Sequence, residues 1–379
     1  MKKISRQPLI KFLASPKLTV ICLFLLLMVV IWGTVYQVDH GLYASQQKFF
    51  YSWFVFLFGV LPIPGTVLIF WVLFLNVLSA MLFRIPLKWS NTGNILTHAG
   101  ILIFFVGSFF TYYFSQESMI SLREGEEKHF SISSRNWELA VWKAGQNKKI
   151  VYAVDADGLG PDDLIRIESL DLDIRVLEYY KNCQAYVESN GQDRDEISNA
   201  SGIHQLKPEP GHKEPSKNRS GLIFSVHSPV EIPGRILLFG GDRGPTLVEV
   251  GGSHHYFSLR KKRFLLPFAL KLIDFKRIFY PGSSIIQSYE SRMELQVKEL
   301  LREVIISMNK PLRYKNFTLY QSSYFIAKDG TEYSVLAVVE NSGKFFPYIA
   351  SIIIFMGLCV HFILMLMKKR KNQRHSFER

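Results

Sequence analysis

Cysteine is scarce in this chain of 379 residues, which contains only three. Cys22 and Cys359 lie in apolar runs, and Cys183 stands alone in the polar part of the sequence. The sequence has no CxxC and no CxxCH motif. It therefore belongs neither to a dithiol reductant nor to a c-type cytochrome, and the polar part has no disulfide framework.

Acidic residues are outnumbered, with 32 Asp and Glu against 45 Lys and Arg and a formal net charge of +13. Twelve of these thirteen charges lie in residues 1–17, at Arg84 and Lys88, and in residues 368–379. All three stretches flank long apolar runs. The excess is therefore typical of topology signals at helix ends and not of a nucleic-acid surface.

Motifs of nucleophilic and phosphate chemistry are also missing. No carboxylate pair, nucleophile elbow or triad has a meaningful spacing, and the glycines of residues 240–245 lack the Gly-Lys-Ser/Thr ending of a phosphate loop. The pair His254-His255 lacks further ligands at metal-binding spacing, so an exposed and idle pair is expected. The basic run 260–263 is either a solvated charge run or a site for anionic groups. No catalytic machinery is evident, which leaves an enzymatic role open.

The sequence contains several long apolar runs. Its mean hydropathy of only +0.11 indicates that a large part of the chain is polar. Residues 18–114 are predicted to hold three transmembrane helices, at 18–36, 67–83 and 95–113, and residues 346–367 a fourth. The apolar segment 51–61 is too short to span and is stopped by prolines, which predicts an interfacial or re-entrant helix. The first run has no small-residue cleavage site, so an uncleaved anchor is expected.

The basic flanks set the predicted topology. By the positive-inside rule, residues 1–17 and 368–379 are cytoplasmic, and residues 115–345 lie outside the membrane. The strand-like runs in this outer part are 172–177, 236–239, 268–275 and 335–339, whereas 289–302 suits either a helix or strands. The fold class predicted is a membrane protein with four transmembrane helices and a large extracytoplasmic β-rich domain between helices three and four. Within that domain, the polar composition of residues 188–220 predicts a mobile loop.

One ionisable residue, His98, interrupts the third apolar run. A charged or strongly polar side chain in hydrocarbon costs roughly 2–3 kcal/mol or more, so this imidazole needs a partner, a cavity or a metal. It is either hydrogen-bonded to a neighbouring helix or a ligand of a metal or haem. His361 in the fourth run has the same two interpretations, with hydrogen bonding or packing favoured and a bis-histidine haem site as the alternative.

Several short motifs carry a resemblance to a known family. They are residues 12–19, 33–37, Gly41, Tyr43, Ala44, Gln46, Asn76, 98–100, Gly107, 267–275, 280–282, 289–291, 308–312, Tyr314, 319–323 and Tyr324. Their order and spacing along the whole chain resemble the ResB family, also called CcsB, of the system II machinery for cytochrome c biogenesis. Residues 188–220 lie outside the resemblance.

The resemblance implies a function in haem handling. Proteins of this family work with a second membrane protein, CcsA, to move haem b across the membrane and present it to the thiols of an apocytochrome c. A histidine of the third helix is an axial haem ligand in the family, and His98 occupies that position here. The tryptophan-rich segment of CcsA is absent from this sequence, so the chain resembles the ResB half alone.

The function predicted is that of a haem-handling subunit of the system II cytochrome c synthase in a bacterial inner membrane, with its large domain on the periplasmic side. The predicted cofactor is haem b, bound or transported. The predicted partners are a CcsA-type protein, apocytochrome c, membrane lipid and, as a further option, a thioredoxin-like thiol reductant. The alternatives are a scaffold for CcsA without haem ligation and a b-type electron-transfer subunit with His98 and His361 as ligands.

Overall fold

The fold is taken from a computed structural model that describes residues 7–57, 59–145, 150–187, 197–199, 201–227 and 234–377. The chain divides into two compact units. The first comprises Met1–Gln116, Lys315–Phe317 and Glu340–Arg379, and the second comprises Glu117–Tyr314 and Thr318–Val339. Each unit is built around its own secondary structure.

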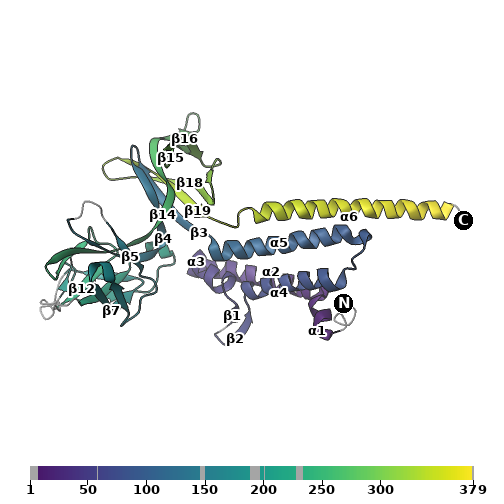
Figure 1. Cartoon of the computed structure of the whole chain (residues 1–379), viewed down its shortest axis with the longest axis horizontal. Coiled ribbons are helices and arrows are strands. Elements are labelled where there is room, and N and C mark those ends of the chain that lie inside the picture. The colour runs from purple at the N-terminus through teal and green to yellow at the C-terminus, as the bar shows by residue number, and fades with distance from the viewer. Residues whose placement is uncertain are drawn as a thin grey trace. The chain divides into compact units, whose positions relative to one another are not determined.

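Helices dominate the first unit (Figure 1). Its α-helices are α1 (Pro8–Leu13), α2 (Pro16–His40), α3 (Leu42–Ser45), α4 (Thr66–Ser79), α5 (Thr92–Phe114) and α6 (Phe346–Phe377). Two π-helical turns, η2 (Gln46–Phe50) and η3 (Ala80–Arg84), and one 3-10 turn, η4 (Trp89–Asn91), join them. Within the described residues, four helical stretches are long and apolar enough to cross a membrane: Pro16–His40, Thr66–Arg84, Trp89–Phe114 and Phe346–Arg370. The four predicted apolar helices are therefore confirmed.

The ends of α2 follow from local chemistry. Ser15 caps its start by accepting a hydrogen bond from the Lys17 backbone N–H at 3.2 Å, and Pro16 occupies the first helical position, where no N–H is needed. Gly41 ends the helix because it adopts φ 84°, a left-handed conformation that favours glycine.

The helix predicted for residues 51–61 is wrong. The segment forms a hairpin of β1 (Phe54–Leu57) and β2 (Leu61–Pro64). Val55 is buried against helices of this unit while Phe54 and Phe56 on either side of it are exposed, which is the two-residue period of a strand. That alternation outweighed the uniformly apolar composition on which the prediction rested.

The second unit is rich in β-structure, as predicted. In its described part, a ten-stranded sheet contains β3 (Gln116–Arg123), β4 (Glu127–Lys143), β5 (Tyr152–Asp155), β13 (Thr246–Val250), β14 (Ser253–Phe279), β15 (Ile286–Val297), β16 (Leu300–Ser307), β17 (Leu312–Tyr314), β18 (Phe317–Ile326) and β19 (Glu332–Glu340). The ambiguous segment 289–302 is thereby resolved as strands. A tight turn with Lys298 at φ 54° joins β15 to β16.

A second sheet packs on one half of the first. Over the described residues it contains β6 (Leu164–Ile167), β7 (Leu172–Tyr180), β9 (Ile197–Ser198), β11 (Gly221–His227) and β12 (Arg235–Phe239). Its side chains form one core with those of β4, β13 and β14, centred on Phe224 and Phe257, whose ring centroids are 5.4 Å apart. Strand β14 continues beyond this core to pair with β15, so it belongs to both halves of the unit (Figure 1).

Part of the segment predicted as a mobile loop holds a strand. β10 (Gln205–Pro208) pairs with β8 (Cys183–Tyr186), and Ile203 and Leu206 are buried beside Cys183. Two large apolar residues in a polar stretch were enough to fix this part to the domain. Residues 188–196 and 200 lie outside the described residues, and the mobility of the segment stays a prediction.

Candidate functional site

His98 lies in the second turn of α5 and is half-buried. Its ring nitrogen Nδ1 lies 2.8 Å from the backbone oxygen of Asn94, one turn earlier in the helix. A carbonyl oxygen can only accept, so Nδ1 must carry the proton and donate it. In the neutral ring the lone pair is then on Nε2, the nitrogen that points away from the helix backbone.

One face of α5 is closed by α6. The glycines of that face recur every seven residues, at Gly93, Gly100 and Gly107. A Cβ added at Gly100 would lie 2.6 Å from a side-chain carbon of Ile354 and 3.0 Å from the backbone oxygen of Ala350. These glycines let the two backbones approach as closely as they do, so no ligand fits between the helices at this face.

This packing predicts the effect of a larger residue. Replacing Gly100 by valine forces the backbone of α6 away and should destabilise the helix pair by about 1–3 kcal/mol. Thermal unfolding of the full chain in detergent measures the loss. Ser108→Val, on an exposed position of the same helix, is the control, and an equal loss in both variants would contradict the packing explanation.

His98 lies on another face of α5. It is followed at helical spacing by Leu102, Phe105 and Phe109, which share its face. Leu102 is buried, and Phe109 stacks on Trp71 of α4 with ring centroids 4.2 Å apart. The imidazole therefore stands at one end of the apolar stripe that α5 turns toward α4.

His98 and His361 lie on two neighbouring helices, α5 and α6. His361 of α6 has its backbone against Gly93, on the glycine face of α5. His98 is five residues after Gly93, which is about 140° further around the helix. The face of α5 that receives the backbone of His361 therefore differs from the face that carries His98, and a bis-histidine site within the chain stays an untested alternative.

The residues at His98 fit a haem iron. A metal-bound histidine usually donates its second ring N–H to a carbonyl or carboxylate, which fixes the ring and its tautomer. The hydrogen bond to Asn94 supplies that second interaction and leaves Nε2 for the iron. In the described part of the chain, no group of three or more His, Cys, Asp or Glu side chains is arranged to hold a metal ion. His98 would hold a haem iron through Nε2, as the single histidine of many haem proteins does.

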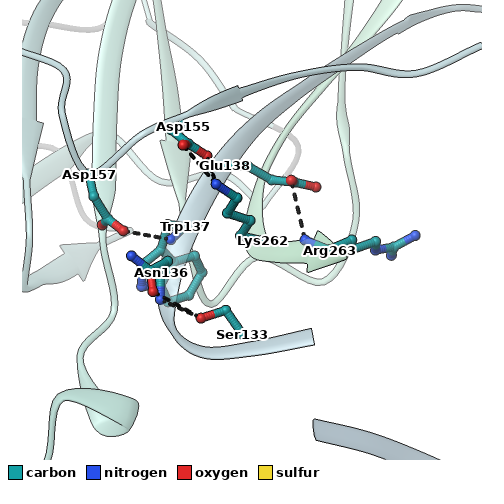
Figure 2. A network of polar contacts seen from close by, with 8 residues as sticks. All are labelled: Ser133, Asn136, Trp137, Glu138, Asp155, Asp157, Lys262 and Arg263. Atoms are coloured by element: carbon teal, nitrogen blue, oxygen red, sulfur yellow. Dashed lines mark hydrogen bonds and ion pairs between the residues drawn. The ribbon is translucent and has the colours of Figure 1, made fainter. Parts of the chain in front are cut away.

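Sequence reasoning missed a polar network at the bulge of β4. The pairing of β4 with β14 passes from Lys261 opposite Trp137 to Arg263 opposite Ile132, so residues 133–136 bulge out. Figure 2 shows the side chains that gather there. Glu138 is almost fully buried, accepts from Arg260 Nε at 2.7 Å and accepts from the Arg263 backbone N–H at 3.3 Å.

The cations of the basic run 260–263 therefore have partners within the domain and do not form an open anion site, although Arg263 is exposed. Lys262 pairs with Asp155 at 2.6 Å, and the Arg263 guanidinium lies 4.6 Å from the ring centroid of Phe130. Lys261 Nζ lies 4.1 Å from the ring centroid of Trp137. The run holds the bulge together, and its 122-residue separation from Glu138 hid the ion pair from sequence reasoning.

A residue next to the same bulge, Trp137, explains why position 240 is a glycine. The ring of Trp137 rests on Gly240, where an added Cβ would lie 2.3 Å from the ring. The glycines of residues 240–245 thus include one that makes room for Trp137.

The expectation for the tandem histidines is half wrong, since His254 is exposed but His255 is buried.

Lys261 gives the domain a pH signature. Burial lowers the pKa of Lys261 to about 8, below its ordinary value of 10.5. Between these values the unfolded chain binds more protons than the folded one, so this residue's penalty on stability is full below pH 8 and fades as the pH rises. The melting temperature of Lys261→Met minus that of the wild type should therefore fall from pH 7 to pH 10. The same trend in exposed Lys328→Met would contradict burial as the cause.

Residues 238–332 match the sequence model of the ResB-like family, and they contain the basic run and all of β14 and β15. Over this segment the chain is similar to the ResB-like family. The chain is also 33% identical over 95 residues to Protein NrfI of Wolinella succinogenes. That similarity covers 24% of this chain and 10% of NrfI, so the chain spans about a tenth of the relative's length. The resemblance to the ResB family found in the sequence is thereby confirmed.

Proposed function

We propose that this chain is a membrane subunit of cytochrome c biogenesis that binds haem b at His98. With a CcsA-type partner it moves haem across the inner membrane and presents it to apocytochrome c. The observation that carries the proposal is the Nδ1 hydrogen bond of His98 to Asn94, which leaves Nε2 free in an apolar helix. The ResB-like match and the four apolar helices support it.

The chain's own contribution is to hold and orient the haem. When bound, haem supplies the iron and the vinyl groups to which the thiols of an apocytochrome add. His98 would hold the haem from one side. Its position on the stripe of α5 that faces α4 would place the haem among apolar side chains. A second ligand to the haem would come from the partner. The β-rich domain is the part that contacts the partner and apocytochrome.

The haem spectrum of the purified complex tests this function. The chain is co-expressed with a CcsA-type partner in haem-replete cells, purified through a tag on this chain, and analysed for b-type haem. One haem that stays with the complex is the expected result. A complex free of haem, or haem that follows the partner when the two are separated, would show that this chain is a scaffold.

Topology is a separate prediction from the charges. Residues 84–90 and the tail beyond residue 367 carry basic residues at the ends of apolar helices, which predicts that both are cytoplasmic. Reporter fusions at residues 90 and 375 should be active in the cytoplasm, and a fusion near residue 205 should be active on the far side. A cytoplasmic signal at residue 205 would contradict the predicted topology of four membrane crossings.

A further inference from the structure

An open cavity of about 300 Å³ lies beside the elbow between α1 and α2. Residues of α1, of the elbow and of η3 line it: Ile10, Lys11, Ala14, Ser15, Pro16, Phe83 and Arg84. Two of these are cations and the others are mainly apolar. The wall contains no acidic residue.

The elbow is held in place by a buried amide. Asn76 of α4 is 2% exposed, and its Nδ2 donates to the backbone oxygens of Leu13 and of Ser15, the latter at 3.0 Å. Its Oδ1 accepts from Thr19 Oγ1 at 2.6 Å. One side chain thus satisfies carbonyls at the end of α1 and ties α2 to α4, so the wall that carries Lys11 is fixed to the helix that leads to Arg84.

The opposite wall is a π-helical turn. In η3 the N–H of Ile85 donates to Ala80 at 3.0 Å, which widens the helix just before Arg84. Such turns are rare and occur frequently at functional sites. Here the turn places both Phe83 and Arg84 at the cavity.

The two cations have no acidic partner. Across the described ranges, neither Lys11 nor Arg84 takes part in an ion pair, although both are exposed. Lys11 and Arg84 lie on separate elements and line one cavity together with the apolar residues Ile10 and Phe83. Such a cavity suits an anion that is joined to an apolar group. A guanidinium prefers phosphate or carboxylate, which it binds through two parallel hydrogen bonds.

We infer that this cavity binds the phosphate of an anionic glycerophospholipid. The apolar stretch of α2 begins at Pro16, and that of α4 with η3 ends at Arg84, so the cavity lies at the edge of two potential spans. Headgroups occupy that level of a bilayer. A lipid with net negative charge neutralises more of the pair Lys11 and Arg84 than a zwitterionic one does.

Thermal unfolding of the purified full chain in mild detergent tests the site. The probes are short-chain phosphatidylglycerol, short-chain phosphatidylcholine and inorganic phosphate, each titrated separately. Phosphatidylglycerol should raise the melting temperature at lower concentration than the other two. In Lys11→Gln/Arg84→Gln the half-effect concentration should rise about tenfold or more, because two charge-assisted contacts are lost.

Two further variants keep the result interpretable. Lys88→Gln removes a cation near the same helix ends but outside the cavity wall and should respond like the wild type. Arg84→Lys keeps the charge without the fork of N–H donors and should fall between the wild type and the double variant. Equal protection by inorganic phosphate would assign the site to free phosphate, and equal protection by phosphatidylcholine would make the charges irrelevant. Both outcomes, or an unchanged response of the double variant, overturn the proposal. The outcome does not depend on the proposed haem function, because the melting temperature is followed against added lipid and phosphate and not against haem content.

Discussion

Replacing His98 by alanine is expected to remove most of the haem from the purified complex and to abolish most cytochrome c maturation. The substitution deletes the proposed axial ligand Nε2 and the hydrogen bond to Asn94. Alanine is the strongest helix former and His98 is not on the face that contacts α6, so α5 should remain folded. Haem content is measured by the absorption spectrum of the complex, and maturation by covalent haem staining.

Free imidazole provides the rescue. Because the truncated side chain vacates a coordination position, added imidazole should restore part of the haem binding and part of the maturation. His361→Ala is the matched control, because His361 is a histidine of a second long apolar helix with its backbone against Gly93, and this variant should retain most of its haem. If His98→Ala keeps its spectrum while His361→Ala loses it, the ligand has been misassigned. If neither changes, the haem belongs to the partner.

The helical part of the fold was predictable because its signal is local. Runs of about twenty apolar residues leave a chain few alternatives to a helix in a membrane. The structure extends the first three predicted helices by one to six residues at an end, and α6 continues to Phe377. The hairpin at residues 54–64 was mistaken for a helix because an apolar run alone does not reveal its period. Only the alternation of Val55 with two exposed phenylalanines reveals the strand.

Long-range pairings were beyond sequence reasoning. The isolated runs 172–177 and 268–275 are visible as strands from their branched apolar residues, yet nothing local indicates that β14 extends over Ser253–Phe279 and joins two halves of one domain. In the same way, Cys183 and Leu206 are neighbours in a small core only because β8 pairs with β10. Such contacts depend on the whole arrangement of strands.

The candidate site was partly predictable. An imidazole in an apolar run is conspicuous, so the sequence alone identified His98. The tautomer of His98 and the face of α5 on which it lies could not be obtained in this way. The tautomer depends on the rotamer that reaches Asn94, and the face is known only once the side of α5 whose glycines contact α6 is known. The structure also distinguishes the two histidines, because the His98 ring donates to Asn94 of its own helix whereas the backbone of His361 lies against Gly93.

The largest effect on stability is expected at the buried ion pair of the β4 bulge. In Glu138→Ala the Arg260 guanidinium, whose side chain is 19% exposed, keeps its charge but loses its carboxylate at 2.7 Å. Removing one partner of a buried pair costs about 3–5 kcal/mol. The Arg263 N–H loses an acceptor as well, so the bulge of residues 133–136 should lose its fixed register.

Two further variants separate this mechanism from a general sensitivity of the domain to lost charge. Glu303→Ala breaks an exposed pair with Arg292 and should cost at most about 1 kcal/mol. Glu138→Met/Arg260→Met removes both charges and should recover most of the loss, because an unpaired buried charge is costlier than an apolar pair of similar volume. For a domain of this size, the loss in Glu138→Ala corresponds to roughly 6–20 °C in the melting temperature of the full chain. If the double variant melts no higher than Glu138→Ala, the cost comes from lost packing and not from the stranded guanidinium. In that case the network in Figure 2 stabilises the domain by its shape alone.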